Sequence, residues 1–169
     1  MPHASLYTHS PKYYHSYFDL VTTDDLLVAL KDNLDLMEEA LLSIPEERLT
    51  YAYAPGKWTI EQVFRHIIET ERILSYRALR FSRHDDTPQP GFDENLYIAN
   101  TAHLRFSRLQ LLDDLVSVRS ATLSLYSTMN DSMLDFMGTA NNVGVSARMI
   151  GFMIAGHAKH HLNVIGERY

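Results

Sequence analysis

The sequence predicts an all-α protein that folds as an up-down four-helix bundle. Four long segments repeat apolar residues at intervals of three and four, which is the period of an amphipathic helix. Shorter segments rich in proline, glycine and asparagine separate them, and no stretch alternates apolar and polar residues convincingly as a strand does. Four long helices without a sheet to pack against favour a bundle.

The length and composition are typical of one globular unit. The chain has 169 residues, of which 46% are hydrophobic and 21% are charged, so it can bury a core of its own. We therefore expect a single domain over residues 1–169. Within it, residues 1–22 are rich in aromatic side chains and contain two prolines, and we expect them to form an arm that lies on the bundle.

The charge balance and the missing residue types exclude several functions. Asp and Glu (21) outnumber Lys and Arg (15), so the chain offers no evident basic surface for nucleic acid. The sequence has no cysteine, which excludes disulfides, thiolate metal sites and cysteine nucleophiles. It shows no secretory signal, and its longest apolar run, near residues 149–155, is shorter than the roughly 20 residues of a membrane helix. We expect a soluble, cytoplasmic protein.

Start and stop signals bound the first two long helices. The first is expected to follow the start signal at residues 23–25 and to end before Pro45. The second opens where Thr59 and Gln62 form a capping-box pattern, and it extends to about Phe81. Its predicted core stripe consists of Val63, Phe64, Ile67, Ile68, Leu74 and Ala78.

Two further helices are predicted in the second half of the chain. Residues 83–103 contain two prolines and a glycine and are interpreted as a long connection, long enough for a role at a site. A third helix is expected over about 104–129. After a break around residues 138–144, Ser146 is a plausible cap for a last helix that ends near Arg168.

Trp58 is the single tryptophan and directly precedes the cap of the second helix. We expect it to pack as a structural anchor and to be more buried than Lys57. A Trp58 exposed along a metal pocket would instead favour a role in substrate binding.

A histidine pair in the last helix is the first candidate for a metal site. His157 and His161 are four residues apart, which places them only about 40° apart around the helix. Ile150, Met153 and Val164 share their face, so the pair is expected to point toward the core. Two imidazoles one turn apart can bind one ion. The alternative is a polar helix end or a hydrogen-bonded core histidine.

His66 in the second helix is the natural third ligand, because bundles build metal sites from side chains on facing helices. Its alternative role is that of an edge histidine bonded to a neighbour. His160 is rotated by about 60° from His157, away from His161, and is expected to point away from the site. The remaining histidines are expected at the surface: His3, His9, His15, His84 and His103.

Other metal and catalytic motifs do not fit. A zincin needs Glu directly after the first histidine, where this chain has Ala158. A di-iron bundle needs Glu-x-x-His pairs, and the sequence has none. The sequence also lacks the G-x-S-x-G elbow, the Walker loop and the G-x-G-x-x-G motif.

Several segments together resemble the DinB/YfiT-like superfamily. They are YAPGKWTI at 53–60, HIIETER at 66–72 and GHAKHHLN at 156–163. The match runs over nearly the whole chain and includes YRALRF at 76–81 and PGFDEN at 90–95, which look like a subgroup of that superfamily. The combined pattern is specific for the family but not for a substrate.

The resemblance implies a bundle in which three histidines bind nickel, zinc or a similar divalent ion, here His66, His157 and His161. Members are described as metal-dependent hydrolases, and relatives include thiol-dependent transferases that act with low-molecular-weight thiols. We therefore expect a hydrolase or transferase with a small-molecule substrate. Two alternatives remain open at this point: a non-catalytic metal-binding or stress-response module, and a structural protein that forms a homodimer. A wide pocket at the histidines would favour the enzyme.

Three protein ligands would leave positions on the ion open for water, an anion or substrate. We expect access from the histidine end, with residues 83–103 as a rim. Glu69 is a candidate base or orienting residue near His66, although a solvated helix face explains it better. Glu71 falls on the apolar arc and is expected to pair with an arginine inside the bundle.

Overall fold

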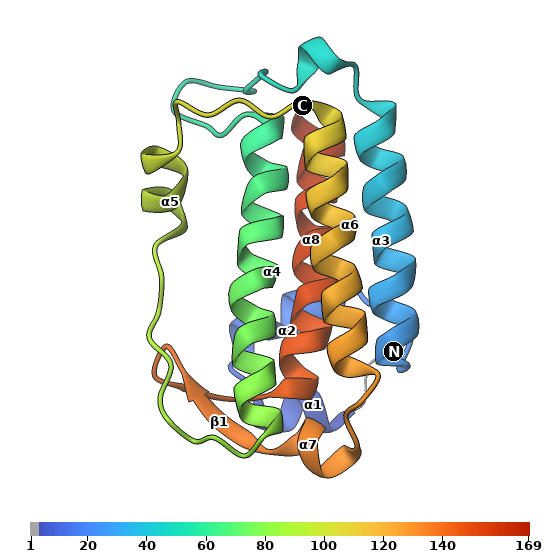
Figure 1. Ribbon diagram of the computed structural model, residues 1–169, viewed down its shortest axis with the longest axis vertical. Coiled ribbons are helices and arrows are strands. Elements are labelled where there is room, and N and C mark those ends of the chain that lie inside the picture. The colour runs from blue at the N-terminus through green and yellow to red at the C-terminus, as the bar shows by residue number, and fades with distance from the viewer. Residues whose placement is uncertain (1–3) are drawn as a thin grey trace.

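Four long helices form the bundle that the sequence predicts (Figure 1). The structure, a computed structural model, describes residues 4–169, so the start of the N-terminal arm and His3 lie outside the described residues. The all-α four-helix bundle is confirmed. The four helices are α3 (Leu26–Ser43), α4 (Ile60–Ser82), α6 (Arg108–Tyr126) and α8 (Ala147–Arg168).

The long connection between α4 and α6 sets the directions of the helices. It runs back along the bundle, so α6 begins at the same end as α4 (Figure 1). Accordingly, Arg65 lies over the ring of Phe106 near the start of both helices, and Ser75 hydrogen-bonds Thr122 further along both. The up-down alternation that the sequence predicts is therefore interrupted between α4 and α6, which run in the same direction because the long connection replaces a short loop. Helix α8 packs against both α3 and α4.

The predicted caps begin three of the helices. The Asp25 carboxylate accepts a hydrogen bond from the Val28 amide at the start of α3, and Ser146 caps α8. Thr59 and Gln62 form the predicted capping box of α4. These side chains satisfy amides that have no partner within the helix, which explains why the helices start there. All six residues of the predicted α4 stripe are buried.

Helix α6 is shorter than predicted. It begins at Arg108 rather than near 104, and it ends at Tyr126 rather than 129. Ser107 and Gln110 form a second capping box, which fixes the start of the helix and leaves the residues before it outside the helix.

Two short helices and a β-hairpin between α4 and α8 were not predicted. Helices α5 (Glu94–Asn100) and α7 (Asp131–Asp135) are short, and β1 (Met137–Ala140) pairs with β2 (Val143–Ser146) as a hairpin. Its turn residues Asn141 and Asn142 both have positive φ, at 50° and 65°, which suits a tight two-residue turn and asparagine in particular. Gln89 forms an isolated bridge with Ala140, so the hairpin also holds the long connection.

The aromatic arm lies on the bundle as expected. It consists of two short helices, α1 (Ala4–His9) and α2 (Lys12–Phe18), with Pro11 between them. Helix α2 packs against α8, and the Phe18 ring is fully buried. The closest approach is at Gly156 of α8, where a Cβ atom would overlap the backbone carbonyl of Tyr17.

Gly156→Ala is expected to destabilise the protein by about 1–3 kcal/mol, because the overlap is with backbone that cannot simply rotate away. Gly166→Ala in the same helix is the matched control. Its Cβ atom would meet nothing within 4 Å, so alanine should stabilise the helix by roughly 0.5 kcal/mol. Urea unfolding followed by circular dichroism measures both. Equal effects of the two substitutions would contradict the close packing of α2 on α8.

A buried ion pair joins three helices in the core. Arg119 of α6 donates to both carboxylate oxygens of Glu71 at 2.8 and 2.9 Å, and neither side chain is more than 2% exposed. The expected pairing of Glu71 with an arginine inside the bundle is confirmed. Arg119 also donates to the Leu30 carbonyl at 2.6 Å and to Asn33 at 3.1 Å, so it links α4 and α6 to α3.

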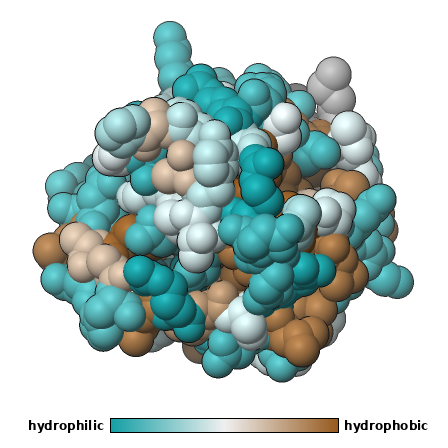
Figure 2. Space-filling view, turned by 90° about the horizontal axis from the view of Figure 1, so that it is seen from above, coloured by the Kyte–Doolittle hydropathy of each residue, from teal (hydrophilic) through white to brown (hydrophobic). Residues whose placement is uncertain are grey.

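Loops cover the end of the bundle at which α3 ends and α4 and α6 begin. Hydrophilic residues occupy much of this face, with hydrophobic ones between them (Figure 2). Leu42 and Leu109 are among the exposed apolar side chains of the neighbouring helix ends. Within residues 4–169, no helix is both long and apolar enough to cross a membrane.

Candidate metal centre

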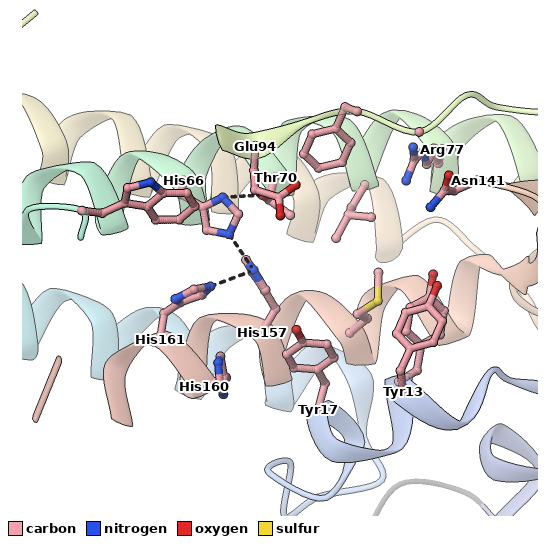
Figure 3. A pocket seen from close by; sticks show the side chains of 16 residues that line it. Tyr13, Tyr17, His66, Thr70, Arg77, Glu94, Asn141, His157, His160 and His161 are labelled. Carbon is pink, nitrogen blue, oxygen red and sulfur yellow. Dashed lines mark hydrogen bonds between the residues drawn. The ribbon is translucent and has the colours of Figure 1, made fainter. Parts of the chain in front are cut away.

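The structure brings the three predicted histidines together between α4 and α8 (Figure 3). The Nε2 atom of His157 lies 3.0 Å from Nε2 of His66 and 3.1 Å from Nε2 of His161. One nitrogen from each of the three rings lies within 4.8 Å of the others. His157 is therefore the central member of the group.

Local packing orients the rings. His157 and His161 are one turn apart on α8, and α4 packs alongside and presents His66 to them. The indole of Trp58 packs on His66 with ring centres 4.9 Å apart, and Tyr17 of α2 contacts His157 with ring centres 5.8 Å apart. The Thr70 hydroxyl lies 3.4 Å from Nδ1 of His66, the nitrogen that faces away from the other histidines. Such a partner on the remote nitrogen fixes the ring that would bind a metal.

The three imidazoles are neutral at physiological pH. Burial lowers the pKa of His66 to about 4, although the nearby Glu94 carboxylate opposes this shift. Burial, followed by the neighbouring His66 and His160, lowers the pKa of His161 to about 3. The pKa of His157 falls well below its ordinary value for the same reasons. A neutral imidazole offers the lone pair that a metal ion needs.

The donor set fits a divalent transition metal. Adjacent ligand atoms around an ion bound at about 2.0–2.1 Å are separated by about 2.9–3.4 Å, and both distances from Nε2 of His157 to the other two Nε2 atoms fall in this range. Nε2 of His157 faces the Nε2 atoms of both His66 and His161. One hydrogen atom can bridge only one of these pairs, whereas one metal ion can bind all three nitrogens. Across the part of the chain that the structure describes, no fourth His, Asp or Glu joins the group. An ion held here would keep open positions.

A cavity of about 380 Å³ adjoins the histidines. The three histidines line it together with tyrosines of α2, three further residues of α4, Met153 and His160 of α8, and Asn141 of the hairpin turn. Gly91, Phe92 and Glu94 of the long connection form part of its wall, which agrees with the rim expected there (Figure 3). The pocket that was expected to distinguish an enzyme from a purely structural protein is therefore present.

Two neighbouring residues, His160 and Glu69, do not belong to the histidine group. His160 is exposed, packs against the Tyr17 ring and is absent from the histidine group, as predicted. Glu69 lies 3.5 Å from the guanidinium of Arg65 and does not line the cavity, which favours the solvated helix face over a role at the site.

Trp58 has features of both roles that the sequence left open, a structural anchor and a residue of the pocket wall. It is half-buried and more buried than the exposed Lys57, as expected for an anchor, and its carbonyl accepts a hydrogen bond from the Tyr169 hydroxyl at 2.7 Å. Its side chain also lines the cavity beside His66. The anchor is therefore also part of the pocket wall.

Most of the remaining histidines lie where the sequence placed them. His9, His84 and His103 are exposed. His15, which was also expected at the surface, is less exposed than these, because it lies in α2 and packs within the arm. It is half-buried, with its ring centre 5.1 Å from that of Tyr7.

Sequence reasoning missed two charged residues of the pocket, Glu94 and Arg77. Glu94 begins α5, whose cap is Asp93, so the Asp-Glu pair after a glycine-containing turn was the available helix signal. Arg77 falls on the face of α4 that also bears His66, three turns earlier. Neither position suggested a site until the connection was seen to fold back over α4.

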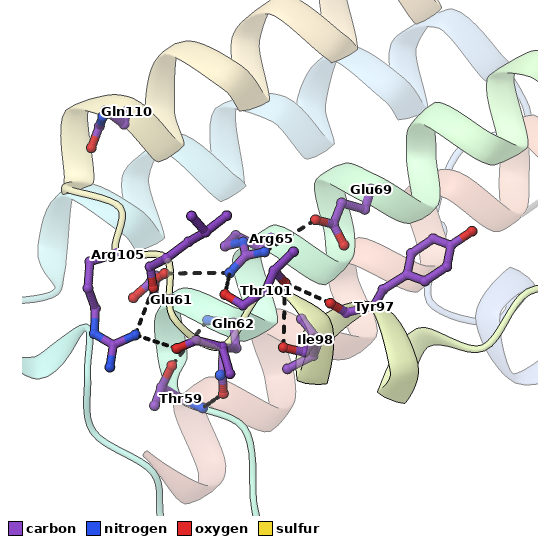
Figure 4. A network of polar contacts seen from close by, with 12 residues as sticks. Thr59, Glu61, Gln62, Arg65, Glu69, Tyr97, Ile98, Thr101, Arg105 and Gln110 are labelled. Carbon is purple, nitrogen blue, oxygen red and sulfur yellow. Dashed lines mark hydrogen bonds and ion pairs between the residues drawn. The ribbon is translucent and has the colours of Figure 1, made fainter.

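Two arginines of α4 hold the connection in place. Arg65 donates to the Thr101 carbonyl at 3.3 Å and lies 3.9 Å from Glu61 (Figure 4). Arg77 donates to the Pro90 carbonyl at 2.5 Å. Helix α5 lies between these two anchors, so its first residue is held against the cavity.

Comparisons with known proteins agree with this picture. The family model described as the DinB superfamily matches residues 29–165. A protein of Oceanobacillus iheyensis named "Putative metal-dependent hydrolase" is 24% identical over 151 residues, which cover 84% of each chain. The structure of YfiT from Bacillus subtilis, described as a probable metal-dependent hydrolase with an unusual four-helix bundle topology, matches with a TM-score of 0.74 at 18% identity. The match covers 85% of this chain and 83% of that one. At this identity the structural likeness shows the fold.

Proposed function

The chain belongs to the DinB superfamily, and from its site we propose that it is a metal-dependent hydrolase whose ion is held by His66, His157 and His161. The observation that carries the proposal is the position of these residues. Three neutral imidazoles stand at the wall of a cavity of about 380 Å³, with no fourth metal-ligating side chain in the described residues. A purely structural site would be closed by the protein.

The names of two similar proteins support the reaction class, since both are described as metal-dependent hydrolases. The three-imidazole donor set suits zinc and nickel, and we propose one of these as the native ion. When bound, such an ion supplies Lewis acidity and lowers the pKa of a water molecule that it coordinates.

Glu94 is the proposed general base and acid. It is the only Asp or Glu among the residues that line the cavity, and it is close enough to His66 to affect the pKa of that ring. A carboxylate in this position accepts a proton from the attacking water and returns it to the leaving group. Thr70 keeps the His66 ring in place, while Leu74 and Met153 exclude bulk water from part of the wall.

Hydrolysis by the reconstituted protein tests the proposal. Protein purified without a metal-affinity column is chelated, reloaded with zinc or nickel, and assayed on a panel of carboxylic esters and amides. We expect turnover that depends on the metal. Glu94→Gln should lower kcat by about 100-fold or more while leaving the bound metal and the circular dichroism spectrum unchanged.

Glu69→Gln is the matched control for Glu94→Gln, because Glu69 lies on α4 close to the site in sequence but outside the cavity. It should retain the kcat of the unmodified protein. A Glu94→Gln variant with full activity would remove Glu94 from the mechanism. Turnover that appears only when a low-molecular-weight thiol is added would favour the thiol-dependent transferase instead, and a loaded protein with neither activity would favour a non-catalytic metal-binding module.

A further inference from the structure

One face of α4 runs from the histidines to a cation. His66, Thr70, Leu74 and Arg77 are spaced by four, four and three residues and all line the same cavity. This spacing places them on one face of a helix. Figure 3 shows the histidines at one end of the pocket and Arg77, beside Asn141, at the other.

Arg77 is a buried cation without a carboxylate partner. The residue is 7% exposed, and its side chain donates to the Pro90 carbonyl. None of the ion pairs within residues 4–169 includes Arg77, whereas Arg72 and Arg80 on the same helix pair with aspartates. Burying a charge without an opposite charge is costly, so such an arrangement indicates that a ligand supplies the missing anion.

The groups around Arg77 are also suited to an anion. Tyr13 of α2 and Asn141 of the hairpin turn line the same end of the pocket (Figure 3), and Tyr14, which also lines the pocket, is close enough to Arg77 to affect its pKa. Burial raises the pKa of the Tyr14 hydroxyl above its ordinary value, so this hydroxyl remains a hydrogen-bond donor at neutral pH. A guanidinium together with hydroxyl and amide donors can surround a carboxylate and bind it through both oxygens.

The pocket contains one guanidinium group and changes in polarity along its length. Among its lining residues, Arg77 is the only Lys or Arg, and three of the four lining histidines, those of the metal group, are neutral. Leu74 and Met153 form apolar wall between Arg77 and the histidines, and Glu94 would repel an anion from the histidine end. One cation balances a monocarboxylate, whereas a phosphate dianion would keep an uncompensated charge.

We infer that the pocket binds an elongated monocarboxylate, with its carboxylate on Arg77, its apolar middle along Leu74 and Met153, and its hydrolysable bond at the histidines. The backbones of His66 and Arg77 are about 16 Å apart along the helix, which requires a ligand longer than a small fragment. The position of the hydrolysable bond rests on the proposed function. The carboxylate subsite does not, because it contains no metal-ligating histidine.

Ligand binding by the full-length protein tests the subsite. The probe is 6-phenylhexanoate, and 6-phenylhexan-1-ol is its neutral match. Calorimetry at pH 7.5, with zinc and after chelation, should show a preference of about tenfold or more for the carboxylate in both states. Arg77→Gln should abolish the preference, and Arg77→Lys, which keeps the charge, should retain part of it. Arg80→Gln is the matched control, since Arg80 is a neighbouring arginine outside the cavity, and it should leave the preference intact.

Three results would overturn the inference. They are equal affinity for carboxylate and alcohol in the unmodified protein, a preference that Arg77→Gln keeps, and a preference seen only with zinc, which would mean that the ion holds the carboxylate. The first result is measured on the unmodified protein, so the inference can be tested even if the Arg77→Gln protein does not fold. If the proposed hydrolase fails instead, ester and amide turnover is absent while the preference for the carboxylate remains.

Discussion

Replacing His157 with alanine is expected to abolish metal binding together with any metal-dependent hydrolysis. His157 provides the central nitrogen of the group, 3.0 and 3.1 Å from those of His66 and His161. Without it, the remaining two imidazoles come from different helices and no longer form a pair one turn apart. The fold should survive, because the apolar stripes of the four helices supply most of the stability. Helical content should therefore remain close to that of the unmodified protein.

The measurements are the metal content after reloading and the circular dichroism spectrum of the same sample. His160→Ala is the matched control, since His160 is a neighbouring histidine on the same helix that is exposed and outside the group. It should bind one equivalent of metal as before. A His157→Ala protein that keeps its metal would contradict the ligand assignment. One that loses its fold together with its metal would indicate a structural ion and weaken the proposal of an enzyme.

Replacing Arg119 with methionine is expected to destabilise the protein by about 3–5 kcal/mol, because the Glu71 carboxylate would remain in the core without its partner. Arg119 is fully buried and makes contacts to Glu71, Leu30 and Asn33. Methionine keeps much of the length of the side chain and removes its charge. Urea unfolding of the metal-free protein measures the difference, so that metal binding does not contribute.

The exposed pair of Arg72 and Asp114 supplies the control, because both side chains are about half exposed. Arg72→Met should cost less than about 1 kcal/mol. Replacing Glu71 with leucine in the Arg119→Met background should recover much of the lost stability, since no buried charge then remains. A loss below about 1 kcal/mol for Arg119→Met alone would show that Glu71 is solvated or protonated.

Signals that act over a few residues predicted the helices well. The caps Thr59 and Ser146 each accept a hydrogen bond from an amide three residues away, so the local sequence contains everything that they need. The error at α6 also concerns a local signal. The capping box of Ser107 and Gln110 was present in the sequence but not recognised, so the predicted helix was begun too early, near residue 104. The hairpin at Asn141 and Asn142 also had a local turn signal.

The histidine group could be predicted because it depends on one helical spacing and on the packing of two helices. His157 and His161 are related by one helical turn, and His66 lies on the apolar face of a helix that had to pack against α8. The rest of the pocket depends on how the connection folds back over α4. The proximity of Glu94 and Arg77 to the site comes from this long-range packing, which no spacing along the chain reports.

The separation of the site residues along the chain has a consequence for folding. His66 and His157 are 91 positions apart, and α8, which packs against both α3 and α4, is synthesised after the other three bundle helices. Closing so long a loop carries a large entropic cost, and contacts between distant residues slow folding. Until α8 has been synthesised, the apolar surfaces of α3 and α4 that it covers remain exposed. The metal site can form only after α8 docks, so a bound ion stabilises the finished bundle and cannot help to nucleate it.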